Sequence, residues 1–221
     1  MNPDRKIFDI LAGAPVAASM ETPVREDAFE MTDHVKIELI EEHFKEIMYI
    51  LGLDLNDDSL AGTPHRVAKM YVKEVFSGLN PANKPAVKLF ENKYQYSEML
   101  IEKNITLYSY CEHHFVPIIG KVHVAYISNG MVIGLSKLNR LVEYYAKRPQ
   151  VQERLTQQVA EGLKEALQSE DVAVMIDAAH LCVASRGIKD TNTSTITTSY
   201  SGAFREEKTK LEFISLVNGG K

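Results

Sequence analysis

The chain has 221 residues and a formal net charge of −5, and 45% of its residues are hydrophobic and 25% are charged. This length and composition are typical of a globular protein with a sizeable core, built as one large domain or as a domain with an N-terminal extension. The acidic balance excludes the strongly basic surface of a nucleic-acid-binding protein, although a small anion can still bind through local cations.

The sequence shows no sign of export or of a membrane span. Asp9 interrupts the apolar run near the N-terminus and Pro15 follows soon after, so no signal peptide is predicted. No apolar stretch reaches the length needed to cross a bilayer. We therefore expect a cytoplasmic protein without a membrane partner.

Residues 1–32 are predicted to be an N-terminal extension. A short amphipathic helix is expected over residues 3–12, and the glycine and prolines of residues 13–32 indicate an irregular linker.

Residues 33–85 are predicted to be a helical region. Asp33 is expected to cap a first helix, in which apolar residues recur every three or four positions until Gly52 ends it. Thr63 and Pro64 predict the start of a second helix, because a capping hydroxyl followed by proline is a helix-start signal.

Residues 86–221 are predicted to form an α+β region around a sheet. Strands are expected over residues 100–110, 116–127, 172–184 and 191–201. Two helices are expected between the second and third strands, the first capped by Ser136 and the second starting after Arg148 and Pro149, and residues 205–217 predict a short last helix. The order strand-strand-helix-helix-strand-strand predicts an antiparallel four-stranded sheet with helices on one face. Its open edges predict an oligomer that covers them.

The two cysteines of the chain each lie close to histidines, in Cys111-Glu112-His113-His114 and in His180-Leu181-Cys182. Zinc prefers thiolate and imidazole ligands, and a catalytic zinc site uses three of them, which Cys111, His114 and Cys182 would supply. Cys111 and His114 can share an ion only where the chain turns, so we place them at a strand end. On a strand, His180 would share a face with Cys182 and lie near the metal without binding it.

Three other interpretations of these residues remain open from the sequence. Cys111 and Cys182 could form a disulfide, which a reducing compartment disfavours, or could be buried inert thiols. A closed structural zinc site is also compatible, with His113 as its fourth ligand.

Charged residues at helix starts give weaker indications. Lys137 and Arg140 fall in the first turn after Ser136, where cations oppose the helix dipole unless an anion binds, so the segment indicates either a phosphate site or a solvated face. Arg66 and Lys69 are most simply a solvated charged face.

Three motifs resemble the type I GTP cyclohydrolase family over roughly residues 33–215. They are Ser109-x-Cys111-Glu112-His113-His114, the run Ala-Lys-Arg-Pro-Gln-Val-Gln-Glu-Arg-Leu-Thr over residues 146–156, and His180-x-Cys182 followed by Arg186-Gly187.

The resemblance implies the tunnelling fold (T-fold) and a homodecamer with active sites between subunits. It implies that Cys111, His114 and Cys182 bind Zn²⁺ and that His113 and His180 are catalytic. The residues that it implies for binding GTP are Arg66, Lys69, Ser136, Lys137, Arg140, Gln152, Glu153 and Arg186. Of these, Gln152 and Glu153 would recognise guanine, and Arg66 and Lys69 would reach the triphosphate from another subunit.

The implied reaction is hydrolysis of GTP at C8 of the purine. Formate is released and the ribose rearranges, which gives 7,8-dihydroneopterin triphosphate in the first step of tetrahydrofolate and pterin biosynthesis. His113 would act as the general acid at N7, and His180 would assist ribose opening.

Overall fold

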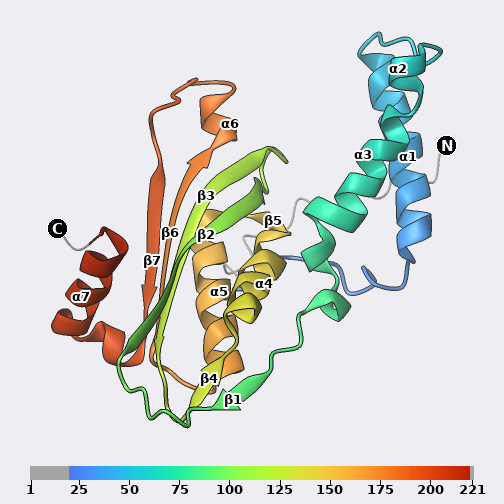
Figure 1. Cartoon of the computed structure of the whole chain (residues 1–221). Helices are drawn as coiled ribbons and strands as arrows, with labels where there is room; N and C mark the ends of the chain where they lie inside the picture. The colour runs from blue at the N-terminus through green and yellow to red at the C-terminus, as the bar shows by residue number, and fades with distance from the viewer. Residues whose placement is uncertain (1–19, 220–221) are drawn as a thin grey trace.

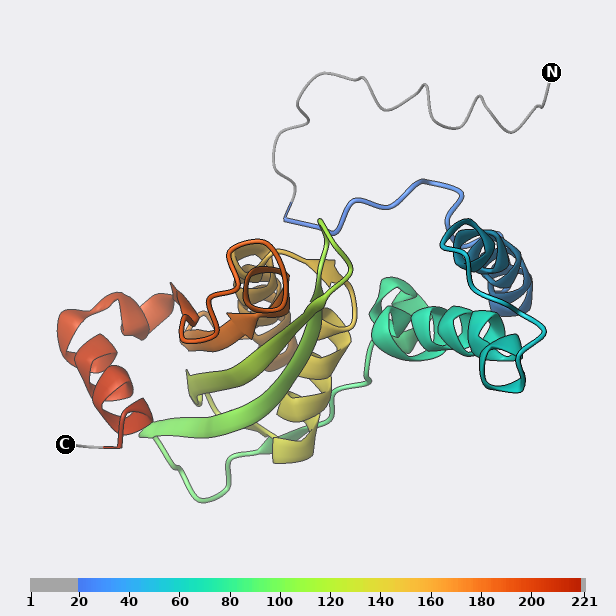
Figure 2. The same cartoon turned by 90° about the horizontal axis from the view of Figure 1, so that it is seen from above.

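The computed structural model describes residues 20–219. The helix predicted over residues 3–12 lies outside this range, while residues 20–32 are irregular, as predicted for the linker. A helical hairpin stands beside a curved sheet that carries two long helices on one face (Figure 1). Seen from above, the helical hairpin lies to one side of the sheet and its two covering helices (Figure 2).

In the described part of the chain, three α-helices come first, four strands follow, and helices and strands alternate from α4 onwards. The α-helices are α1 (Asp33–Ile50), α2 (Asp58–Ala61), α3 (Thr63–Met70), α4 (Leu135–Ala146), α5 (Gln152–Leu167), α6 (Leu181–Ala184) and α7 (Glu207–Val217). The strands are β1 (Leu89–Glu91), β2 (Met99–Cys111), β3 (Pro117–Ile127), β4 (Met131–Ile133), β5 (Pro149–Gln150), β6 (Val172–His180) and β7 (Thr195–Tyr200). Within residues 20–219, no helix combines the length and the apolarity that crossing a membrane requires.

The hairpin begins one residue earlier than predicted. Thr32 is the N-cap of α1, and its side chain accepts a hydrogen bond from the Val35 amide. Asp33 is the first helical residue, where its negative charge interacts favourably with the helix dipole. Gly52 follows the helix with a φ of 82°, a left-handed conformation that glycine adopts without strain, so its predicted role at the helix end is confirmed.

The second arm of the hairpin starts as predicted but is capped differently. Gly62 occupies the N-cap of α3, and the Thr63 hydroxyl accepts a hydrogen bond from the Arg66 guanidinium at 2.8 Å. Past Met70 the arm continues as a π-helical turn over Tyr71–Val75.

The main sheet has five strands in the order β5-β2-β3-β6-β7, so the predicted number of four is wrong. The four predicted strands pair antiparallel, and β5 adds a short parallel pairing to the end of β2. The prediction missed β5 because the pairing of Pro149–Gln150 with Tyr110 and Cys111 joins distant parts of the chain. A separate two-stranded sheet joins β1 to β4.

One face of the sheet is covered by α4 and α5, which form the main core together with the strands of the sheet. The fully buried leucines of this core are Leu107, Leu138, Leu141, Leu155, Leu163 and Leu167. The predicted cap of α4 is wrong, because Gly134 is the N-cap and Ser136 makes no capping hydrogen bond.

The opposite face of the sheet carries a second apolar cluster. Phe204 and Phe213, the latter from α7, pack with Ala125, Ala173 and Met175 from β3 and β6. The expectation that all helices cover one face is therefore wrong for α7, whose Phe213 is fully buried against the sheet.

Candidate metal and substrate site

Cys111, His114 and Cys182 converge at one end of the sheet. Their ligand atoms all lie within 4.8 Å of one another, and both cysteines are free thiols. Two thiolates and one imidazole are a donor set that zinc accepts, with a fourth position left for water. The three residues predicted to bind metal can therefore hold an ion together, and the disulfide alternative is not formed.

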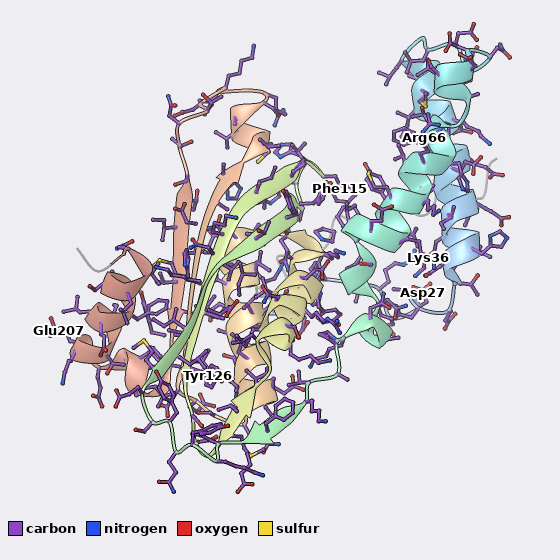
Figure 3. All side chains as sticks on the ribbon, in the orientation of Figure 1. Asp27, Lys36, Arg66, Phe115, Tyr126 and Glu207 are labelled. Atoms are coloured by element: carbon purple, nitrogen blue, oxygen red, sulfur yellow. The ribbon has the colours of Figure 1, made fainter. Side chains whose placement is uncertain are left out.

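The turn between β2 and β3 presents Cys111 and His114 on the same side. The Cys111 amide donates to Val116 O at 2.9 Å, and the Phe115 amide donates to Cys111 O at 2.8 Å. Phe115 is labelled in Figure 3. It takes a left-handed φ of 52°, and its ring centroid lies 4.9 Å from that of Phe76. This aromatic contact ties the turn to the helical hairpin and fixes its direction.

Cys182 approaches the site from a helix and not from a strand. β6 ends at His180, and Cys182 lies in α6, so the strand predicted over residues 172–184 is too long. The Ser185 amide bonds Leu181 O at 2.9 Å, which closes this short helix. His180 and Cys182 therefore do not share a strand face, and of the two only Cys182 belongs to the group that could hold a metal.

His180 is held by the side chain of Gln152. Its Nε2 lies 2.7 Å from Gln152 Oε1. Burial lowers the pKa of His180 from its ordinary value, and the nearby Glu153 carboxylate opposes this shift. A histidine that is neutral near neutral pH can accept a proton.

His113 is more open than His180. Its side chain is 63% exposed, and its Nδ1 lies 3.7 Å from Cys111 Sγ. Its Nε2 is 3.8 Å from the Glu112 carboxylate. The His113 ring is therefore largely exposed beside Cys111.

Glu112 and Arg154 form a brace that the sequence analysis did not assign. The Arg154 guanidinium pairs with the Glu112 carboxylate, and its Nε donates to Gln150 Oε1 at 3.2 Å. The Glu112 amide also donates to Gln150 O at 2.9 Å. The brace joins the metal-binding turn to β5 and α5. Its only sequence signal was an acid and an arginine within the two motifs.

Three of the residues predicted to bind triphosphate lie far from the metal group within one chain. Ser136, Lys137 and Arg140 lie at the start of α4, which follows β4 at the sheet end marked by Tyr126 (Figure 3). Phe115, next to His114, marks the other end.

Arg186 is the predicted phosphate ligand that lies near the metal group. It is exposed just after α6, and its charge acts on the Cys182 thiol, although burial and the Cys111 thiol together raise the pKa of Cys182. Arg66 and Lys69 lie on α3, in the separate hairpin, where the Arg66 guanidinium also donates to Ser59 O at 3.0 Å.

Comparison with known proteins identifies the family. A family model described as GTP cyclohydrolase I matches residues 40–218. GTP cyclohydrolase 1 of Flavobacterium johnsoniae is 58% identical over 210 residues, which cover 95% of this chain and 94% of that protein. GTP cyclohydrolase 1 of Citrobacter koseri and that of Escherichia coli are each 53% identical over 205 residues, or 92% of both chains. By these matches over almost its whole length, the chain belongs to the GTP cyclohydrolase I family.

Proposed function

We propose that this protein hydrolyses GTP at C8 of the purine, releases formate and rearranges the ribose to give 7,8-dihydroneopterin triphosphate. The observation that carries the proposal is the convergence of Cys111, His114 and Cys182 within 4.8 Å, in a chain that belongs to the GTP cyclohydrolase I family. His113, whose Nδ1 lies 3.7 Å from Cys111 Sγ, and His180, two residues before Cys182 in the sequence, provide groups for proton transfer.

The metal that this donor set favours is Zn²⁺. Cys111, His114 and Cys182 would hold it, and no fourth protein ligand belongs to the group among residues 20–219. When bound, zinc supplies a Lewis acid and lowers the pKa of a water molecule in its open position.

Glu153 is the residue proposed to recognise guanine. It is exposed at the first turn of α5, and none of the groups in the described chain donates a hydrogen bond to its carboxylate. An ionised carboxylate can accept two adjacent N–H groups of guanine in one plane, which adenine does not offer. Gln152, its predicted partner in this role, has its amide engaged elsewhere.

The triphosphate is proposed to bind cations from more than one subunit. Arg186 lies at the end of the sheet that carries the metal group. The start of α4, with Ser136, Lys137 and Arg140, lies at the opposite end of the sheet. Arg66 and Lys69 would come from a further subunit. This proposal is supported by the wide separation of the predicted ligands within one chain, which prevents them from contacting the same triphosphate. A site between subunits of a T-fold homodecamer would bring all of them to one triphosphate.

The two histidines would divide the proton transfers. His113 would protonate N7 of the purine, which makes C8 electrophilic towards water. His180 would move the proton needed to open the ribose ring before the second ring closes. The expected order is attack at C8, ring opening, loss of formate, ribose rearrangement and closure to the pterin.

An anaerobic assay of zinc-loaded protein with GTP tests the proposal, with formate and oxidised pterin measured together. Equal amounts of formate and pterin are expected, and the Cys182→Ser variant should form neither. Formate without pterin would show a reaction that stops at a ring-opened intermediate. GTP binding without either product, together with unfolding on zinc removal, would identify a non-catalytic module with structural zinc.

A further inference from the structure

We propose that Gln152 is a positioning residue that fixes His180 as the tautomer protonated at Nε2, with Nδ1 left free to accept a proton. The proposal rests on the catalytic role proposed above for His180. It assigns Gln152 to the histidine instead of to the guanine base.

The strands around Gln152 fix the orientation of its amide. Its Nε2 lies 2.7 Å from Thr195 O and 3.2 Å from Ile176 O, and both of these carbonyl oxygens can only accept hydrogen bonds. The amide nitrogen must therefore face the strands, because an oxygen there would meet two other oxygens. Oε1 then points in the opposite direction, towards His180.

Two threonines complete the same network. Thr156 Oγ1 donates to Gln152 O at 2.8 Å, so its single hydrogen is used there. Thr197 Oγ1, 2.6 Å away, then donates to Thr156 and keeps its lone pairs for the Gln152 amide at 3.1 Å. Both amide hydrogens are thus committed to β6 and β7, and the Gln152 side chain has no donor to offer a purine.

The oxygen of the oriented amide decides which nitrogen of His180 carries the hydrogen. Gln152 Oε1 cannot donate, so the contact of 2.7 Å requires a hydrogen on His180 Nε2. In the neutral ring, Nδ1 then has the lone pair. Because Gln152 is 1% exposed and bonded to two strands, it holds the ring in one orientation.

The wild-type protein gives the direct test. Zinc-loaded protein labelled with ¹⁵N-histidine would be studied by NMR at a pH where the rings are neutral, with the His180 signals identified by their loss in His180→Asn. We expect a protonated Nε2 and an unprotonated Nδ1. A proton on Nδ1 would overturn the proposal.

Kinetics of a matched pair of variants separate positioning from guanine recognition. Gln152→Met should lower kcat by about 10- to 100-fold, the usual cost of losing such a supporting contact, with an unchanged KM for GTP and unchanged zinc content. Gln158→Met is the control, because Gln158 is 3% exposed in the same helix and bonds Gln150 and the Met20 carbonyl but not His180. A raised KM with normal kcat in Gln152→Met would show guanine recognition and overturn the proposal.

A milder variant covers the case in which Gln152→Met does not fold. Thr197→Val removes one acceptor of the amide and should lower kcat to a smaller extent, and Thr197→Ser should restore it. Equal rates in Thr197→Val and wild type would contradict the network. If His180→Asn formed pterin at the wild-type rate while wild type released formate normally, the positioning role would be lost and the overall reaction would stand.

Discussion

His114 is the imidazole of the three residues that can share a metal ion, and its removal should separate metal binding from folding. We expect His114→Ala to lose most of its zinc and to release no formate, because two thiolates alone leave the ion with too few protein ligands. Zinc per chain would be measured by atomic absorption after dialysis. His43→Ala is the control, since His43 is 78% exposed on α1. Full zinc content in His114→Ala would contradict the assigned ligand set.

His123, on the second face of the sheet, should make stability depend on pH. Burial lowers its pKa from the ordinary value of 6.5, which the Asp177 carboxylate opposes and Lys103 reinforces. The unfolded chain therefore binds a proton at a higher pH than the folded chain does. The stabilisation is complete above pH 6.5 and is lost as the pH falls through the lower, folded-state pKa.

Unfolding by urea at several pH values checks this dependence. The free energy of unfolding should fall on acidification below pH 6.5 in the wild type, and His123→Gln should show a shallower slope. His43→Gln should keep the wild-type slope. If His123→Gln and wild type had equal slopes, His123 would not contribute.

At the residue scale, spacing predicted the metal ligands but not their support. Cys111, His114 and Cys182 stand out because the chain has only two cysteines and both lie close to histidines. The bonds of Gln152 join α5 to β6 and β7, and such contacts between distant segments leave no local pattern. The resemblance assigned Gln152 by motif, and geometry gives its amide another partner.

Helix α5 contributes a row of buried apolar side chains to the main core. Leu163 is 1% exposed between the sheet and α4, so Leu163→Ala should lower the free energy of unfolding by about 2–5 kcal/mol. Glu161→Ala, an exposed change on the same helix, should cost less than about 0.5 kcal/mol. Chemical denaturation measures both. A Leu163→Ala protein as stable as Glu161→Ala would mean that the core repacks around the lost side chain.

At the element scale, length decided what could be predicted. The long periodic segments α1, α5, β2 and β3 lie where the sequence patterns place them. The short elements β5 and α6 were missed, because two or four residues carry no periodicity and depend on neighbours supplied by the rest of the fold. These two elements adjoin the metal group, so the least predictable elements shape the site.

At the scale of the whole molecule, an active site between subunits predicts complementation. Cys182→Ser damages the metal end and Arg140→Ala damages the start of α4. Each variant should be inactive or weak alone. Refolded together in equal amounts, they should regain roughly a quarter of wild-type activity, because each shared site needs one intact part from each of two chains.

The control mixture is Cys182→Ser with Cys111→Ser, which share the damaged end and should recover nothing. Light scattering on the same samples gives the assembly. If the mixture of Cys182→Ser and Arg140→Ala has the size of the wild-type oligomer but regains no activity, the whole site lies within one chain. A monomeric wild-type protein would contradict the homodecamer.

The separation of the ligands along the chain sets an order for folding. β2 and β3 are consecutive strands, so Cys111 and His114 come together through contacts that are short-range in sequence. Cys182 arrives only after β6 pairs with β3, a long-range step that is expected to be slower. Metal uptake during refolding should therefore follow completion of the sheet. The ion would therefore bind, and stabilise, only chains in which the C-terminal strands have already joined the sheet.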